Sequence, residues 1–440
     1  MPPRQKPNSE PKETSRKKHI GLYILAFILL CILLFLISAP RLLSRTYERG
    51  NENATSTSVL DSILPPKKDE APHVKTPDAV KAIYMSQCVV GTPSFRDKLV
   101  TLINETEVNA VIIDVKDFTG KIAFPTDNPA VAPSVTDGCG ARDMKDFVKR
   151  LHDHNIYVIA RITVFQDPFY TAEHPELAVK RESDGGVWKD HKGLAFIDVG
   201  AEPFWEYIVE VSKETYDIGF DELNFDYVRY PSDGNMKDIA FMLDVGELKA
   251  DKLEEFFAYL YENLSEPWEG NEDVPKLSAD LFGYTTTNKD DLGIGQVIER
   301  ALPYFDYVMP MVYPSHYNAG FIGIAKPATQ PYEIIKYSMD EAVRRAKLLA
   351  SAKTSTATTT EMIALREQSK KGHGNINPLQ LRPWLQDFDL GATYTPEMVR
   401  TQMQATYDAG LTSWALWDAG NTYTRAALKD DISAEVSLEE

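Results

Sequence analysis

The chain has 440 residues, of which 43% are hydrophobic and 25% are charged, as is usual for one large globular domain or two small ones. Its balance is acidic, with a formal net charge of -18 at pH 7 and a pI near 5.0. An acidic surface repels phosphate backbones, so the composition argues against nucleic acid as a partner.

Residues 20–39 are apolar and carry no charge, and about twenty such residues suffice for a helix that crosses a bilayer. Lys and Arg are more numerous in residues 1–19 than directly after the apolar segment, which favours a cytoplasmic N-terminus. The segment is longer than the usual signal-peptide core of ~7 to 15 residues, and Pro40 follows without an A-x-A pattern. We therefore interpret it as an uncleaved single-pass anchor in the cell membrane, with a cleaved signal peptide as the alternative.

Residues 40–78 are predicted to form an extracytoplasmic linker, because they are poor in apolar side chains and rich in Pro, Ser and Thr. Two of the three cysteines, Cys88 and Cys139, follow this linker. An oxidising compartment would allow them to form a disulfide, and two free thiols are the alternative.

Residues 79–428 alternate between segments rich in β-branched and aromatic residues and segments whose apolar residues recur every three or four positions. Eight such strands joined by helices predict an α/β fold of the (β/α)8 TIM-barrel type. An open doubly wound sheet is the alternative, although no glycine-rich phosphate fingerprint follows the first strand. Residues 429–440 read as an acidic tail. The predicted strands begin at or near Lys81, Asn109, Tyr157, Phe220, Pro275, Tyr307, Leu379 and Thr412.

The loops that leave the carboxyl ends of the strands build the active site of such a barrel, and they are long after the second, third and sixth strands. The third loop contains Gly185, Gly186 and Trp188 and is predicted to be a lid with an aromatic platform, a plain surface loop being the alternative. Residues 351–375 are polar and are expected to form an excursion before the seventh strand.

Alternation along each strand separates side chains that face the helices from those that face the barrel axis. In the second strand, Val111, Ile113 and Val115 are expected to face the helices. The same phase directs polar groups inward, where they form either a self-satisfied salt-bridge layer or the lining of a wet cleft. The layer would pair Asp114 with Lys116 or Arg161, and Asp226 with Arg229. The inward set is Asp114, Lys116, Arg161, Thr163, Asn224, Asp226, Ser278 and Asp280, joined by Tyr313 and Trp417 on the sixth and eighth strands.

Asp226 and Asp280 lie on neighbouring predicted strands and are predicted to be catalytic. Cleavage of a glycosidic bond needs one carboxyl that protonates the leaving oxygen and another that acts as a nucleophile or activates water. Asp226 lies close in sequence to Arg229, whose charge favours the ionised carboxylate of a nucleophile or cation-stabilising group. Asp280, next to Leu281 and Phe282, is the expected protonated acid, because desolvation raises a carboxyl pKa.

Aromatic and polar side chains at the strand ends would hold the sugar rings, and a polysaccharide is the expected ligand. A barrel that binds polysaccharide without cutting it is the alternative. The predicted substrate-binding residues are Asp114, Lys116, Arg161, Asn224, Arg229, Tyr313, His316, Trp188 and Trp417.

Neither a metal nor a cofactor is predicted. His152 and His154 end a helix on the opposite face of the barrel, while His316 and His373 lack the spacing of a zinc site. No G-x-S-x-G nucleophile elbow is present.

Several long motifs occur in order, namely VIIDVKDFTGKI, YVIARITVFQDP, GGVWKDHKGLAFIDV, FDELNFDYVRYPSDG, SADLFGY and PMVYPSHY. Together they resemble a glycoside hydrolase family of bacterial (β/α)8 barrels, long catalogued as a domain of unknown function and distantly similar to amylase and chitinase barrels. The resemblance covers residues 81–423 and implies a catalytic centre at the acidic end of the fourth strand. Asp221 and Asp226 match the two acidic positions of the family's fourth-strand motif, and Asp280 matches the acidic residue of its fifth-strand motif.

The chain departs from both better-known barrel types. Val228 stands where the chitinase pattern has its acid glutamate, which argues against substrate-assisted chitinase chemistry. Asp280 stands where the amylase type has a glutamate at the end of the fifth strand.

Overall fold

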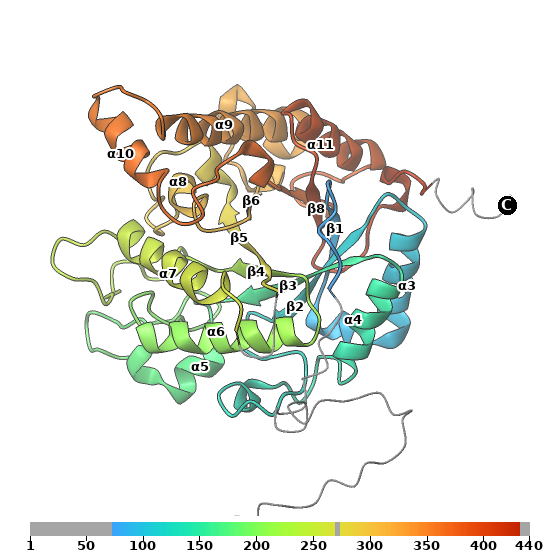
Figure 1. Cartoon of the computed structure of the whole chain (residues 1–440), viewed down its shortest axis with the longest axis horizontal. Helices are drawn as coiled ribbons and strands as arrows, with labels where there is room; N and C mark the ends of the chain where they lie inside the picture. The colour runs from blue at the N-terminus through green and yellow to red at the C-terminus, as the bar shows by residue number, and fades with distance from the viewer. Residues whose placement is uncertain (1–72, 269–272, 432–440) are drawn as a thin grey trace, which may run out of the picture. The chain divides into compact units, whose positions relative to one another are not determined.

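The computed structural model describes residues 73–268 and 273–431. Eight parallel strands form a closed barrel in the order β1 to β8, and helices surround it (Figure 1). The predicted parallel eight-stranded barrel is therefore confirmed. Within the described residues no helix is long and apolar enough to cross a membrane, and the predicted anchor at residues 20–39 lies outside them.

The strands are β1 (Lys81–Met85), β2 (Ala110–Lys116), β3 (Tyr157–Thr163), β4 (Glu222–Asp226), β5 (Lys276–Phe282), β6 (Tyr307–Met311), β7 (Trp384–Gln386) and β8 (Trp414–Trp417). The α-helices are α2 (Gln87–Val90), α3 (Pro93–Asn104), α4 (Met144–Asp153), α5 (Pro168–Glu173), α6 (Glu202–Asp217), α7 (Lys249–Leu264), α8 (Ile298–Ala301), α9 (Pro331–Ala352), α10 (Thr360–Gln368) and α11 (Pro396–Asp408). Short 3-10 helices are η2 (Ala132–Ser134), η3 (Pro175–Leu177), η4 (Gly283–Thr286), η5 (Pro314–His316), η6 (Phe321–Gly323), η7 (Pro327–Thr329), η8 (Pro378–Gln380) and η9 (Arg425–Ala427).

Two segments differ from the sequence-based expectation. The strand predicted near Leu379 is reduced to the three residues of β7, preceded by η8, because Pro383 has no backbone N–H to donate to a ladder. The polar excursion at 351–375 contains helix α10, whose N-cap Thr359 accepts a hydrogen bond from the backbone N–H of Met362 at 3.3 Å.

The expected strand phase is observed in the packing. Val111, Ile113, Leu223 and Phe225 belong to a large apolar cluster shared by the strands and the surrounding helices. A separate apolar cluster fills the barrel interior, and it includes Tyr84, Ala110, Ile112, Tyr157, Ile159, Met309 and Trp384. The interior of the barrel therefore has an apolar core of its own. The polar groups of the candidate site lie nearer the carboxyl ends of the strands.

The amino-terminal end of the barrel is closed by ionic and hydrogen-bonded contacts. Arg382 and Glu222 form a fully buried ion pair with a 2.8 Å contact. Asp221 accepts hydrogen bonds from the backbone N–H groups of Val158 and Val74, each at 2.8 Å, and lies 3.0 Å from His152 Nε2. Asp221 is one of the two acidic residues in the family motif. It stabilises the amino-terminal end of the barrel and lies at the opposite end of β4 from Asp226.

Cys88 and Cys139 form a disulfide with a Cα–Cα distance of 4.3 Å. The bond joins α2, which follows β1, to the long loop after β2. Arg96 on α3 reaches the same loop through an ion pair with Asp143. The covalent and ionic contacts together hold this loop against the barrel.

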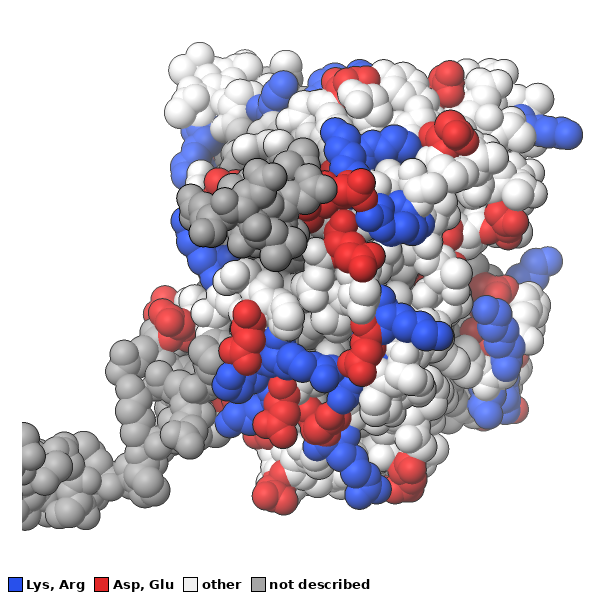
Figure 2. Space-filling model, turned by 90° about the vertical axis from the view of Figure 1, so that its right-hand side faces the viewer, with Lys and Arg blue, Asp and Glu red and all other residues white. Residues whose placement is uncertain are grey.

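Acidic and basic side chains are interspersed on the face shown in Figure 2, with no continuous stripe of one sign. This face therefore lacks the basic track that a nucleic-acid backbone requires.

Candidate active site

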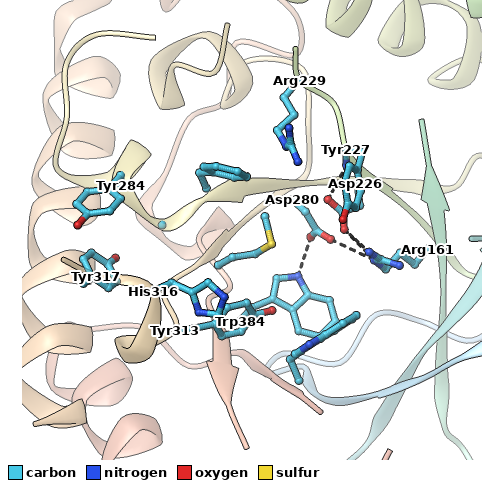
Figure 3. A pocket seen from close by; sticks show the side chains of 14 residues that line it. Arg161, Asp226, Tyr227, Arg229, Asp280, Tyr284, Tyr313, His316, Tyr317 and Trp384 are labelled. Atoms are coloured by element: carbon cyan, nitrogen blue, oxygen red, sulfur yellow. Dashed lines mark hydrogen bonds and ion pairs between the residues drawn. The ribbon is translucent and has the colours of Figure 1, made fainter. Parts of the chain in front are cut away.

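A cavity of about 430 Å³ opens at the carboxyl ends of the strands (Figure 3). This volume lies within the range of small-molecule sites. Its charged lining residues are Arg161, Asp226, Arg229 and Asp280. Its aromatic wall is formed by Tyr227, Phe282, Tyr284, Tyr313, Tyr317, Trp384 and Trp417.

Arg161 on β3 is the centre of the charged cluster. Its Nε donates to Asp226 Oδ2 at 3.0 Å and its Nη2 reaches the same oxygen, while its Nη1 donates to Asp114 Oδ1 at 2.5 Å. Asp280 Oδ2 lies 3.8 Å from Nε. Asp114 also accepts a hydrogen bond from the Tyr84 hydroxyl at 2.5 Å. The guanidinium therefore compensates carboxyl groups from three strands, as its fork of five donors allows.

The backbone turn after β4 presents Asp226 to the cavity. Tyr227 has a φ of 53°, the left-handed region that bulky residues rarely adopt. In this conformation the Tyr227 backbone N–H donates to Asp226 Oδ1 at 2.5 Å. Both oxygens of Asp226 therefore accept donors, an arrangement that stabilises an ionised carboxylate.

Asp280 on β5 lies in a different environment, with only 1% of its surface exposed. Its Oδ1 accepts hydrogen bonds from Trp384 Nε1 at 2.7 Å and from Asn224 Nδ2 at 3.0 Å. Burial raises the pKa of Asp280 well above its usual range, and the charge of Asp226 raises it further, whereas Arg161 lowers it. The raised pKa that desolvation predicted is therefore observed; of the two flanking apolar residues, Phe282 lines the cavity and Leu281 faces the helices.

The two carboxyl groups lie close together. Asp226 Oδ2 and Asp280 Oδ2 are at 3.0 and 3.8 Å from the same Arg161 Nε, so these oxygens are at most about 7 Å apart. Retaining glycosidases place their carboxyls about 5 to 5.5 Å apart, and inverting enzymes about 6.5 to 9.5 Å apart. The limit of about 7 Å includes the retaining range and reaches the lower edge of the inverting range.

Most of the predicted binding residues gather at this cavity. Arg229, Tyr313, His316 and Trp417 line it. Burial lowers the pKa of His316, so this ring is neutral at neutral pH. Asp114 contacts the cluster through Arg161, and the fully buried Asn224 supports Asp280 from behind. Arg229 does not form the expected ion pair with Asp226, because Arg161 occupies that position.

Lys116 was predicted to bind substrate, and the structure contradicts this. A β-bulge between Asp114 and Lys116 shifts the register so that Lys116 pairs with Ile162, whose side chain faces the helices. Lys116 is fully buried, pairs with Asp167 at 2.7 Å and donates to the Thr163 carbonyl at 2.7 Å. It therefore supports the loop after β3 and cannot reach a ligand in the cavity.

Trp188 was predicted to be an aromatic platform, and this is also wrong. The indole is 2% exposed and packs with Val179 and Phe196 in a small core of its own. Its Nε1 donates to the Asn235 carbonyl at 3.1 Å, joining the loop after β3 to the loop after β4. The Trp188 indole is therefore buried between the loop after β3 and the loop after β4, and it stabilises the contact between them.

The sequence-based reading missed Trp384, Tyr227, Tyr284 and Tyr317, which all line the cavity. Trp384 could have been found, since alternation with the helix-facing Leu385 places it on the inner face of β7. The other three lie outside the strands, Tyr284 in η4 and Tyr227 and Tyr317 in loops, where alternation gives no information.

A closed parallel barrel with paired carboxyls and an aromatic wall at the carboxyl ends of its strands defines the class of TIM-barrel glycoside hydrolases. The chain belongs to the family whose model is described as "Putative glycosyl hydrolase domain" and matches residues 82–423. The resemblance seen in the motifs is therefore confirmed.

Solved structures include similar chains. A hypothetical protein from Ruminiclostridium thermocellum ATCC 27405 is 33% identical over 48% of this chain and 98% of that chain, with a TM-score of 0.40. The PgaB (BpsB) glycoside hydrolase domain from Bordetella bronchiseptica is 12% identical over 78% of this chain and 95% of that chain, with a TM-score of 0.50. At 12% identity the second likeness supports the fold alone. A search of curated proteins found no significant match.

Proposed function

We propose that this chain is a membrane-anchored glycoside hydrolase that cuts a cell-wall or extracellular polysaccharide outside the cytoplasm. The observation that carries the proposal is the pair Asp226 and Asp280, which lie on neighbouring strands, face one cavity and lie in contrasting environments. Paired carboxyls in contrasting environments are the arrangement that acid-assisted glycosidic cleavage requires.

In the proposed reaction Asp280 is the general acid. Among the described residues no hydrogen-bond donor reaches its Oδ2, whereas Oδ1 accepts from Trp384 and Asn224. A proton on Oδ2 would pass to the glycosidic oxygen as the bond to the anomeric carbon breaks. The carboxylate left behind is stabilised by the two donors on Oδ1 and by Arg161 at 3.8 Å.

Asp226 is the nucleophile or cation-stabilising carboxylate. Its negative charge compensates the positive charge that develops on the sugar ring, and attack on the anomeric carbon would form a glycosyl-enzyme ester. Ionised Asp280 would then take a proton from the water that hydrolyses this ester, which restores the starting protonation state. The aromatic wall supplies faces on which sugar rings pack.

The anchor and location rest on the sequence. The uncharged apolar segment at 20–39 and the basic residues before it support a cytoplasmic N-terminus with the barrel outside. The disulfide between Cys88 and Cys139 is consistent with an oxidising compartment.

Release of reducing ends from a panel of cell-wall and extracellular polysaccharides tests the hydrolase. Asp226→Asn and Asp280→Asn should each lower turnover by roughly 10² to 10⁴-fold while the melting temperature stays within a few degrees. Asp340→Asn is a matched control, because this carboxylate is exposed on α9 and pairs with Lys336. Wild-type turnover by Asp226→Asn would refute the assignment.

A non-catalytic polysaccharide-binding barrel is the second candidate. The observation that favours it is that Arg161 forms ion pairs with both Asp114 and Asp226. In that case the panel would show binding by several glycans with no reducing ends released, and the Asn variants would bind as the wild type does.

A further inference from the structure

Arg229 contributes a guanidinium to the cavity in addition to that of Arg161. It lies in the loop after β4, three residues beyond Asp226, and points into the cavity from the side of Tyr227 (Figure 3). Its Cζ is 4.9 Å from the centroid of the Tyr227 ring and 4.8 Å from that of Phe282. Nη1 donates to the Tyr230 carbonyl at 3.0 Å. Two rings and a carbonyl therefore fix the orientation of this group.

Arg229 has no carboxylate at ion-pair distance among the described residues, in contrast to Arg161 with three. Asp226, Asp190 and Asp233 act on it only through space. Burial lowers the pKa of Arg229, but a guanidinium stays cationic at neutral pH. The two rings and the Tyr230 carbonyl replace only part of the hydration that this partly desolvated cation loses, and none of them carries a negative charge. An anionic group on a ligand would supply the missing partner.

We propose that Arg229 binds a negatively charged substituent of the substrate, so that the cavity takes a sugar bearing a carboxylate, phosphate or sulfate group. This proposal rests on the proposed function, because it assigns the substrate class of the same cavity. The planar fork of a guanidinium matches the paired oxygens of such groups and can donate two parallel hydrogen bonds to them.

The other charged or ionisable groups of the cavity do not compete for this role. The Arg161 donors are directed at Asp114 and Asp226, and burial keeps His316 neutral at neutral pH. Arg229 is close in sequence to Asp226 and lines the same cavity, so the charged sugar would lie at the reacting carboxyls rather than at a remote surface.

The acidic net charge of -18 opposes a dense polyanion but has little effect on a single buried contact. Interactions between exposed charges are screened over about 8 Å at physiological ionic strength. The structure is therefore suited to a glycan that carries isolated anionic units.

Binding of matched neutral and charged sugars to the full chain tests the proposal. The probes are glucose and galactose, their uronic acids, their 6-phosphates and their 6-sulfates, each titrated by calorimetry. At least one charged sugar should bind roughly tenfold or more tightly than its neutral parent, and the strongest of the three charged groups identifies the source of the anion. A panel in which no charged sugar binds better than its neutral parent overturns the proposal.

Arg229→Met should abolish the preference for the charged sugar, so that the charged sugar binds no more tightly than its neutral parent. Arg229→Lys keeps the charge without the fork and should retain part of the preference. Arg344→Met is the control, because Arg344 is exposed on α9 and pairs with Glu341. If Arg229→Met fails to fold, a preference that Arg229→Lys leaves at the wild-type value refutes the bidentate contact, and a reduced one supports it.

The outcome can be separated from that of the hydrolase proposal. Charged sugars that bind through Arg229, with no glycan ever cut, would leave the anionic subsite standing and remove the hydrolase. Efficient cleavage of a neutral glycan, with no binding of charged sugars, would support the hydrolase and refute the anionic subsite.

Discussion

Replacement of Trp384 by Phe isolates one hydrogen bond to the proposed acid. The Trp384 Nε1 donates to Asp280 Oδ1 at 2.7 Å, and this bond lowers the pKa of Asp280 against the larger effect of burial. Phe fills much of the same space without the N–H. The carboxylate form of Asp280 then loses one of its two donors and keeps the one from Asn224.

The size of the effect follows from the strength of the bond. A hydrogen bond to a charged group contributes about 1.5 to 3 kcal/mol, and about 1.4 kcal/mol corresponds to one pH unit in a pKa. Loss of the Trp384 bond destabilises only the ionised form, so the pKa of Asp280 should rise by about 1 to 2 pH units. A general acid with a higher pKa stays protonated to higher pH, so the basic limb of the pH profile of kcat/KM should move upward by this amount.

The assay is the pH dependence of kcat/KM on the polysaccharide that the panel identifies, together with a ¹³C NMR titration of the aspartate carboxyl carbons, which needs no substrate. Trp414→Phe is the matched control, because its buried indole on β8 faces the helices and donates to the Tyr407 hydroxyl at 2.8 Å. Trp414→Phe should lower the stability of the fold without shifting the basic limb of the pH profile. A basic limb that stays fixed or moves downward in Trp384→Phe would show that Asp280 is not the acid.

Three further predictions concern the frame of the site and its location. Lys116→Met should lower the free energy of unfolding, measured in urea titrations, by about 3 to 5 kcal/mol, because it leaves Asp167 buried without its cation. The kcat should be unchanged. A loss of kcat with wild-type stability would show that Lys116 acts in the site. Replacing Cys88 and Cys139 by Ser should cost roughly 4 kcal/mol in the chain-entropy model, and two free thiols in the intact mass of exported wild-type protein would contradict the bond. Protease added to intact cells should digest the barrel and leave residues 1–19 protected, whereas a protected barrel would reverse the proposed topology.

The barrel could be predicted because its signals are local and repeat. Segments such as Val111 to Val115 and Leu223 to Phe225 alternate on a pleat whose outer face is covered by helices, so periodicity alone separates the two faces. The seventh strand was predicted but too long, because Pro383 interrupts the segment and only three residues remain in the strand. Helix α10 was not predicted, because none of its side chains is buried and its sequence therefore has no periodic apolar face.

The charged centre of the site was predicted from the alternation of side chains along the strands. Asp114, Arg161, Asp226 and Asp280 were placed on the inner face and meet there, but Lys116 was misplaced because one extra residue in the ladder reverses the phase, and a bulge has no clear signal in a single sequence. Periodicity also cannot predict contacts between loops. The burial of Trp188 depends on the loop that carries Asn235, forty-seven positions further along the chain.

The two interpretations of the inward charges, a salt-bridge layer and a reactive cleft, describe the same group of atoms. Three carboxyl groups, those of Asp114, Asp226 and Asp280, share the single guanidinium of Arg161. Burial raises the pKa of both Asp114 and Asp280, and the charge of Asp226 raises that of Asp280 further. Asp114 accepts donors on both oxygens, whereas Asp280 accepts them on Oδ1 alone, so the retained proton is best placed on Oδ2 of Asp280. The burial that makes the cluster costly as a salt-bridge layer is therefore also what would keep a proton available for the proposed acid-assisted reaction.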